Sequence, residues 1–349
     1  IGDGNITALS TDAVAALNTT QIRGLTADQI GALTADQRDA LSAAQLGAFL
    51  DTQIRSLSSD AIAGLSTSQI RGLTANQVRA LSGEQVAALT EEEIGALSAT
   101  QVRGFSRTQI SELALTQVGA LSVPQIAALS GGQIAGLSES ALSSLSDEQL
   151  GALSAAQIQA LSQTQVKSLT TDAIASLSTT QVRALSTLQI AGLNEEQVAA
   201  LSSTQVGSLS GAQLGTLRAT QVQALELDDI SALSTTQIRS LTATQAGALS
   251  AEQFNVLSAE QLGAFSTSLI KSLSESNIAE LSSEQLAGLS SAQIGALTTT
   301  QIQSLSAANI GSLSTTQVRG LTSVQARVLN TDQIDALSLV QVASIANIT

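Results

Sequence analysis

Leucine recurs at every eighth position along almost the whole chain. It starts at Leu9, and the exceptions are Phe49, Phe105, Phe265 and Ile345. Ile or Val usually follows five residues after the Leu, so that an octad reads Leu, Ser/Thr, x, x, Gln, Ile/Val, x, Ala/Gly/Ser, and we number these positions 1 to 8. The octads follow one another without insertion or deletion. This regularity predicts a single continuous repeat array over residues 1–349 with no internal domain boundary.

A period of eight does not fit one continuous α-helix, because eight residues at about 100° each rotate the Leu by about 80° per octad. One short helix per octad fits better. Ser or Thr at position 2 is a favoured N-cap, and Gln three residues later completes a capping box. Leu at position 1 and Ile or Val at position 6 then form a hydrophobic staple. Good caps are missing in only a few octads, at Leu50, Ala114, Arg218, Glu226 and Ala346.

Charged residues are segregated within the octads. Of the 28 acidic residues, 23 lie at positions 3 to 5, as Glu84 and Asp147 do, and of the 14 basic residues, 11 lie at position 7, as Arg71 and Arg239 do. Aligned peptide dipoles favour acids in the first turn of a helix and bases in the last. Charge placement therefore indicates a helix over positions 3 to 8 independently of the caps.

Two aliphatic side chains per octad do not offset the entropy of ordering eight residues, so octads must stack on one another. The small residues at position 8 allow such close stacking. We therefore expect an all-α solenoid, a superhelix of very short helices with one helix per octad. A β-solenoid is the alternative, since Ile and Val at position 6 suit a strand. Ala at position 8, the scarcity of turn signals and the charge segregation favour the helical solution.

The composition excludes several kinds of chemistry. The chain has no Cys, His, Met, Trp or Tyr, so it lacks a thiol nucleophile, an imidazole acid or base, a soft metal site and the usual haem ligands. We expect no catalytic, cofactor-binding or metal-binding residues and no enzymatic activity. A net charge of −14 argues against nucleic acid as a partner. No apolar run approaches the roughly 20 residues of a membrane span.

Five local features of the sequence are candidate sites. The acidic runs Glu91–Glu93 and Asp228–Asp229 offer carboxylates to Ca²⁺, but they stand where acids favour a helix N-terminus. The segment Ile1–Asn5 resembles a calcium loop with too few ligands, and we interpret it as a turn. Gly131–Gly132 lacks the Lys of a phosphate loop. Arg38 occupies position 6, where we expect a packing defect with the guanidinium directed outward.

The octads themselves resemble a known kind of repeat. Strings such as Leu177 to Ala184 (LSTTQVRA) and Leu297 to Ser304 (LTTTQIQS) are similar to the tandem octapeptide arrays of very large exported bacterial surface proteins, often labelled exoproteins or adhesins. The resemblance covers the entire chain. It implies export, an extracellular or cell-surface location, and a role in a filament or stalk.

These observations lead to an expected function of the structural class. We expect a subunit or segment of a self-assembling extracellular filament or surface stalk, which associates with further copies end to end and also laterally. The alternative is a repeat binding module that presents its surface to carbohydrate, ice or Ca²⁺. Such a module would present one face of uniform residues, and positions 3, 4 and 7 show a charge bias but no strict identity, which favours the structural function.

Overall fold

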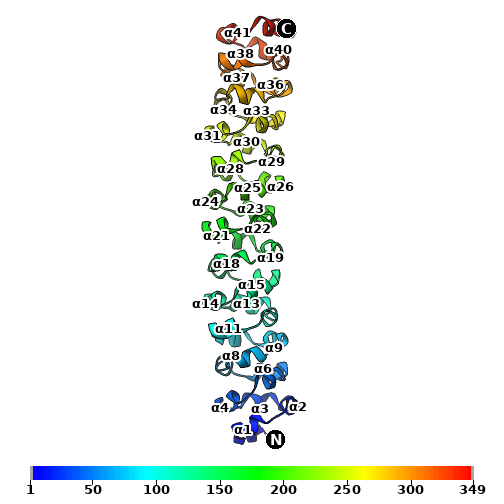
Figure 1. Ribbon diagram of the computed structural model, residues 1–349, viewed down its shortest axis with the longest axis vertical. Coiled ribbons are helices and arrows are strands. Elements are labelled where there is room, and N and C mark those ends of the chain that lie inside the picture. Colours follow the sequence, from blue (N-terminus) through cyan, green and yellow to red (C-terminus); the bar gives the residue numbers. More distant parts are fainter. Residues whose placement is uncertain (1–2, 347–349) are drawn as a thin grey trace. The chain divides into compact units, whose positions relative to one another are not determined.

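The computed structural model describes residues 3–346, and these residues form short helices and no strand (Figure 1). The expectation of an all-α chain with one helix per octad is therefore confirmed, and the β-solenoid alternative is wrong for the described residues. The chain divides into two compact units, Ile1–Leu177 and Ser178–Thr349, which are described separately below. The expected absence of an internal boundary stays a prediction.

From residue 3 onward, the first unit contains one 3₁₀-helix and 21 α-helices: η1 (Asp3–Ala8), α1 (Thr11–Ala15), α2 (Thr19–Arg23), α3 (Ala27–Gly31), α4 (Ala35–Asp39), α5 (Ala43–Gly47), α6 (Asp51–Ser56), α7 (Ser59–Ala63), α8 (Thr67–Gly72), α9 (Ala75–Ala80), α10 (Gly83–Ala88), α11 (Glu91–Ala96), α12 (Ala99–Val102), α13 (Arg107–Glu112), α14 (Leu115–Gly119), α15 (Val123–Ala128), α16 (Gly131–Ile134), α17 (Glu139–Ser143), α18 (Asp147–Gly151), α19 (Ala155–Ala160), α20 (Gln163–Lys167) and α21 (Thr171–Ser176).

The second unit contains a further 21 α-helices within its described residues: α22 (Thr179–Ala184), α23 (Thr187–Gly192), α24 (Glu195–Ala199), α25 (Ser203–Ser208), α26 (Gly211–Gly215), α27 (Ala219–Gln223), α28 (Leu227–Ser231), α29 (Thr235–Ser240), α30 (Ala243–Gly247), α31 (Ala251–Asn255), α32 (Ala259–Gly263), α33 (Thr267–Ser272), α34 (Glu275–Ala279), α35 (Ser283–Ala287), α36 (Ser291–Ala296), α37 (Thr299–Ser304), α38 (Ala307–Ser312), α39 (Thr315–Val318), α40 (Ser323–Arg327), α41 (Thr331–Asp335) and α42 (Leu339–Ala346).

The helices begin at position 3, as the capping pattern predicts. Ser98 is typical: its hydroxyl accepts a hydrogen bond from the backbone N–H of Gln101, and the Gln101 side chain accepts one from the backbone N–H of Ser98. This reciprocal capping box satisfies two helix N–H groups that have no partner within the helix. At Leu50, Ala114, Arg218 and Glu226 the side chain makes no cap hydrogen bond, as the sequence indicates.

Most helices end at position 7 or 8, because the next Leu adopts an extended backbone. Leu89, for example, follows α10 with φ −61° and ψ 133°. The last helix differs: α42 continues through Ile345 and Ala346, which are positions 1 and 2 of the next octad. Ala346 therefore lies within a helix and is not an N-cap.

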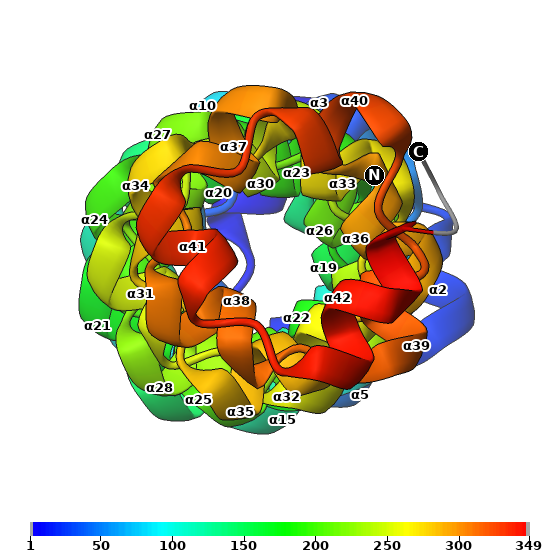
Figure 2. The same cartoon turned by 90° about the horizontal axis from the view of Figure 1, so that it is seen from above.

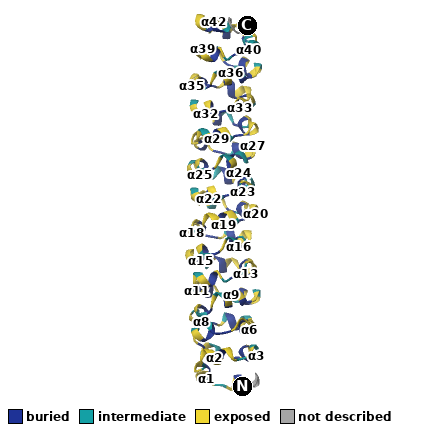
Figure 3. Ribbon diagram, turned by 90° about the vertical axis from the view of Figure 1, so that its right-hand side faces the viewer, coloured by how far each residue is buried: buried dark blue, intermediate teal, exposed yellow. Residues whose placement is uncertain are grey.

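The core of each unit is formed by positions 1, 5 and 6. Ile70 is fully buried, and Leu73 is only 4% exposed. Figure 3 shows the resulting alternation of buried and exposed residues along the helices. Near the ends of the described residues these core positions are less buried. Leu17 and Leu25 at position 1 are half-buried near the start, and Ile334 at position 6 is exposed near the end. Earlier octads thus cover the Leu of position 1, and later octads cover the aliphatic residue of position 6.

Each helix packs against the helix three octads further along the chain. In the second unit α33 contacts α36 and α36 contacts α39, and Figure 2 shows these three helices on the same side of the view. Hydrogen bonds between neighbouring turns join residues 25 to 31 apart, as Arg55 with Ala80 and Gln101 with Ile70 do. The middle of that span is 28 residues, so one superhelical turn takes about three and a half octads.

Candidate functional site

The most regular polar feature is the Gln side chain at position 5, which links one superhelical turn to the turn before it. In Gln101 the Oε1 atom accepts from the backbone N–H of Ser98 at 2.8 Å. The Nε2 atom of the same side chain donates to the carbonyls of Ile70 and Leu73, both at 2.7 Å. Gln101 is only 4% exposed. One buried amide therefore closes the capping box of its own helix and joins two turns.

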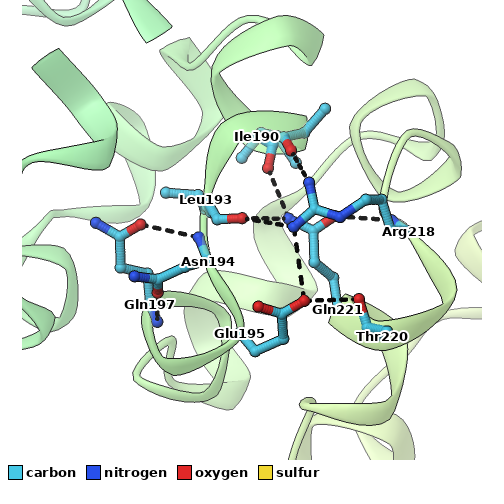
Figure 4. A network of polar contacts seen from close by, with 9 residues as sticks. Ile190, Leu193, Asn194, Glu195, Gln197, Arg218, Thr220 and Gln221 are labelled. Carbon is cyan, nitrogen blue, oxygen red and sulfur yellow. Dashed lines mark hydrogen bonds and ion pairs between the residues drawn. The ribbon is translucent and has the colours of Figure 1, made fainter. Parts of the chain in front are cut away.

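The same bonds recur throughout both units, and together we call them the amide ladder. Figure 4 shows Gln221 donating to the carbonyls of Ile190 at 3.3 Å and Leu193 at 2.8 Å. One carbonyl belongs to position 1, which precedes the Gln by 28 residues, and the other usually belongs to position 6, which precedes it by 31. At Gln149 the second carbonyl is instead that of Gly119 at position 7. The capping box is predictable from the octad sequence. The amide ladder is not, because nothing within one octad shows which octads become neighbours.

Position 7 provides a second set of links between turns. The Nε atoms of Arg23, Arg55 and Arg103 donate to the position 8 carbonyl that lies 25 residues later, at distances of 3.0 to 3.2 Å. Gln223 makes the same bond to Ala248 at 3.0 Å. These carbonyls are at helix C-termini and have no partner within their own helix. A polar side chain at position 7 therefore caps the C-terminus of a helix in the next turn.

One ion pair joins side chains among the described residues, between Arg218 and Glu195 at 3.7 Å (Figure 4). Thr220 donates a 2.6 Å hydrogen bond to the same carboxylate, and this bond is the main reason that the pKa of Glu195 is lowered. The Arg218 guanidinium also donates to the carbonyls of Ala191 and Leu193. Arg218 replaces the Ser of an N-cap, so its octad loses a cap and gains contacts with the preceding turn.

Two octads carry an acid in place of the ladder amide. Glu93 is 3% exposed, its Oε2 atom accepts from Thr90, and its buried Oε1 atom has no hydrogen-bond partner. Burial is the main cause of the raised pKa of Glu93. Asp229 is 2% exposed and accepts from the backbone N–H of Glu226, and burial raises its pKa to about 6. Neither ionised carboxylate can donate to the preceding turn.

The acidic runs considered above lie at helix N-termini. Glu91 and Glu92 are exposed at the start of α11, and the described residues contain no cluster of three or more acids, His or Cys that would hold a metal. Gly131–Gly132 opens α16 in the same manner. The guanidinium of Arg38, which is half-buried, donates at 2.6 Å to the carbonyl of Leu33 in its own octad.

The start of the chain is described only in part. Of the segment Ile1–Asn5, the first two residues lie outside the described residues, and Asp3 opens the 3₁₀-helix η1. Among residues 3–346, no helix is both long enough and apolar enough to cross a membrane.

The fold and the amide ladder define a class, the helical octapeptide-repeat solenoids. The chain belongs to the ALTTAQ repeat family, which it matches in six segments that together cover more than half of its length: residues 6–42, 62–91, 174–211, 222–259, 276–307 and 307–339. No curated protein matches the chain. The resemblance to tandem octapeptide arrays is thus confirmed at the level of a repeat family.

Proposed function

We propose that the chain is a structural protein, a subunit or segment of a self-assembling extracellular filament or surface stalk. The observation that carries the proposal is the amide ladder, in which the same donors and acceptors recur on turn after turn. A solenoid of this kind gains stability from each neighbour it adds, and its length is set by the number of octads. Such a design suits a spacer or scaffold.

Every turn has two complementary faces. One face presents the Leu of position 1 and the Nε2 donor of the ladder Gln, and the other presents the Ile or Val of position 6 with the two acceptor carbonyls. In the last two described octads, Ile334 is 48% and Val342 44% exposed on this second face. A turn from another copy would bring to this face the same Leu and Gln groups that the next turn of the same chain brings. This complementarity supports end-to-end association.

Further support comes from the composition. The chain lacks the imidazole and thiol groups that most acid–base and nucleophilic catalysis uses. The absence of Cys suits a fibre that does not depend on disulfide formation outside the cell. The extracellular or cell-surface location rests on the resemblance to exported repeat proteins, and a net charge of −14 makes nucleic acid an unsuitable partner.

Electron cryomicroscopy of the purified chain, with a dilution series, tests the proposal. We expect fibres of uniform width whose helical repeat corresponds to about three and a half octads per turn, and we expect them to shorten on dilution. Isolated particles of constant length at every concentration would contradict self-assembly. A variant that places charge on the exposed face, I334K/V342K, should shorten the fibres, whereas T331K/L339K at two exposed residues of position 3 in the same two octads should not.

A further inference from the structure

Three arginines of the first unit line one cavity on its outer surface. Arg79 belongs to α9, Arg103 follows α12, and Arg107 opens α13. The cavity has a volume of about 650 Å³, and its other walls include Ala128, Ser130 and Gln133 but no acidic residue. We call these three residues the arginine cluster. Three of only 14 basic residues thus meet in one place on a chain with a net charge of −14.

Two of the three guanidinium groups are held in place by the neighbouring turn. Arg103 donates from Nε to the carbonyl of Ala128 at 3.0 Å, and Arg107 donates from a terminal nitrogen to the carbonyl of Ala135 at 3.2 Å. A guanidinium has five N–H donors, so most of the donors stay available. All three residues are exposed, and the ion pair of the described residues involves other groups. Fixed guanidinium groups bind carboxylates with little further loss of side-chain entropy.

We propose that the arginine cluster is a lateral contact site that binds carboxylates on a second copy of this chain. The proposal rests on the proposed function, since it supplies the sideways contact between filaments or stalks. Charge complementarity identifies the occupant. Each copy carries 28 acidic residues, and adjacent acids such as Glu91–Glu92 and Asp147–Glu148 are exposed on its surface. Two neighbouring carboxylates match a cluster of arginines better than one does.

The contact is heterologous, because the arginine cluster of one copy meets acids of another copy at a different place on the repeat. Each copy therefore has both a donor and an acceptor surface, and lateral association can continue beyond a pair. Because the groups are exposed, salt must weaken the contact strongly.

The test compares two variants that remove the same charge. R79Q/R103Q/R107Q removes the cluster, and Gln is chosen because, at the position 7 that Arg79 and Arg103 share, Gln223 keeps the bond to the next turn. R23Q/R183Q/R319Q is the matched control, since it removes three arginines from position 7 elsewhere. Sedimentation velocity and electron microscopy at low and high salt measure association and bundle width, and circular dichroism measures folding. R79E is a second variant that leaves the two carbonyl bonds in place.

We expect the wild-type chain and the control to associate side by side at low salt and to separate at high salt. R79Q/R103Q/R107Q and R79E should weaken lateral association at least about tenfold without changing end-to-end growth. The acid variant, E91K/E92K or D147K/E148K, that removes the partner carboxylates should also weaken it, and mixing that variant with R79E should restore pairing, because the intact cluster of one copy meets the intact acids of the other. Equal association of the cluster variant and the control, or wild-type fibres that never pair, overturns the cluster and leaves the filament standing. A wild-type chain that is monomeric under all conditions overturns both.

Discussion

The side-chain amide of Gln101 and the backbone carbonyl of Leu73 lie 2.7 Å apart, although 28 residues separate them in the chain. The same amide nitrogen also reaches Ile70, and the amide oxygen accepts from Ser98. Only a side chain with a donor and an acceptor on one carbon can make both kinds of contact. A side-chain amide is therefore favoured over a carboxylate at position 5, and Asn309 donates from this position as Gln does.

The amide donor of Gln101 should contribute to the stability of the fold. Q101E removes the donor at pH 7 and leaves a buried carboxylate opposite two carbonyls, so it should lower the free energy of unfolding by about 1–3 kcal/mol. Gln163, which is exposed at position 3 of α20, provides the control. Urea unfolding followed by circular dichroism measures both variants. Similar decreases in the free energy of unfolding for Q101E and Q163E would show that the bonds of the ladder amide do not contribute to stability.

The reverse substitution should stabilise the protein at Glu93. In the register of the ladder, a Gln here would donate to the carbonyls of Ile62 and Leu65, which are 31 and 28 residues earlier. E93Q should therefore raise the free energy of unfolding at pH 7 by about 1–3 kcal/mol. A loss of stability in E93Q would contradict this placement of the side chain.

The gain from E93Q should depend on pH. Burial places the pKa of Glu93 above its ordinary value in the folded chain, so protonation favours folding. The wild-type stability is complete at low pH, where Glu93 is protonated in both states, and falls as the pH rises through the folded pKa. The difference between E93Q and the wild type should therefore shrink on acidification. The other charged residues of Glu93's own helix, α11, are Glu91 and Glu92. On α7 and α8 the charged residues are Asp60 and Arg71, respectively.

Asp229 gives a second pH-dependent position, in the other unit. Its pKa rises from 3.8 to about 6 on folding, with Glu226 and Asp228 adding to the effect of burial. The wild-type stability should thus be complete below about pH 4 and decline through about pH 6. D229N should remove this decline, because Asn does not titrate. The position accommodates Asn, since Asn309 at the same position donates to the carbonyl of Leu281 at 2.7 Å. Thermal unfolding between pH 3.5 and 8 measures both chains, and parallel profiles would refute the assignment.

Glycine is required only where neighbouring turns approach closely, as Gly72 at position 8 and Gly119 at position 7 illustrate. A Cβ atom on Gly72 would collide with the backbone of Ala43, whereas one on Gly119 would meet nothing within 4 Å. G72A should therefore lower the free energy of unfolding by about 1–3 kcal/mol. G119A should raise it by about 0.5–1 kcal/mol, since Ala favours a helix over Gly. Chemical unfolding of the two variants distinguishes steric contact from helix propensity.

Most of each octad's structure is predictable from the sequence, because caps, staples and dipole effects act within eight residues. Ser98 and Gln101 formed a capping box as predicted, and the preference of Arg103 for position 7 fits a helix C-terminus. The partners of Gln101 and Arg103 in other turns were not predictable. They depend on how far each octad rotates the chain, and this rotation is set by packing between octads.

The outer surface was predicted least well. Arg79, Arg103 and Arg107 stand in three separate octads, and only the superhelical turn brings them to one cavity. The sequence also gave no sign that Arg38 would bond to Leu33 in its own octad. Local patterns thus identify the elements, and the spacing between turns decides which exposed residues become neighbours.

The register between turns is the central claim, and an engineered disulfide tests it most directly. The hydroxyl oxygens of Ser143 and Ser168 lie 3.2 Å apart across two turns, and the natural chain contains no Cys. S143C/S168C should form an intramolecular disulfide in high yield on mild oxidation, measured by mass spectrometry and non-reducing electrophoresis. S154C/S168C, whose residues are 14 apart and thus half a turn from each other, should not. Failure of the first pair to form a disulfide, or equal yields from both pairs, would contradict a turn of about three and a half octads.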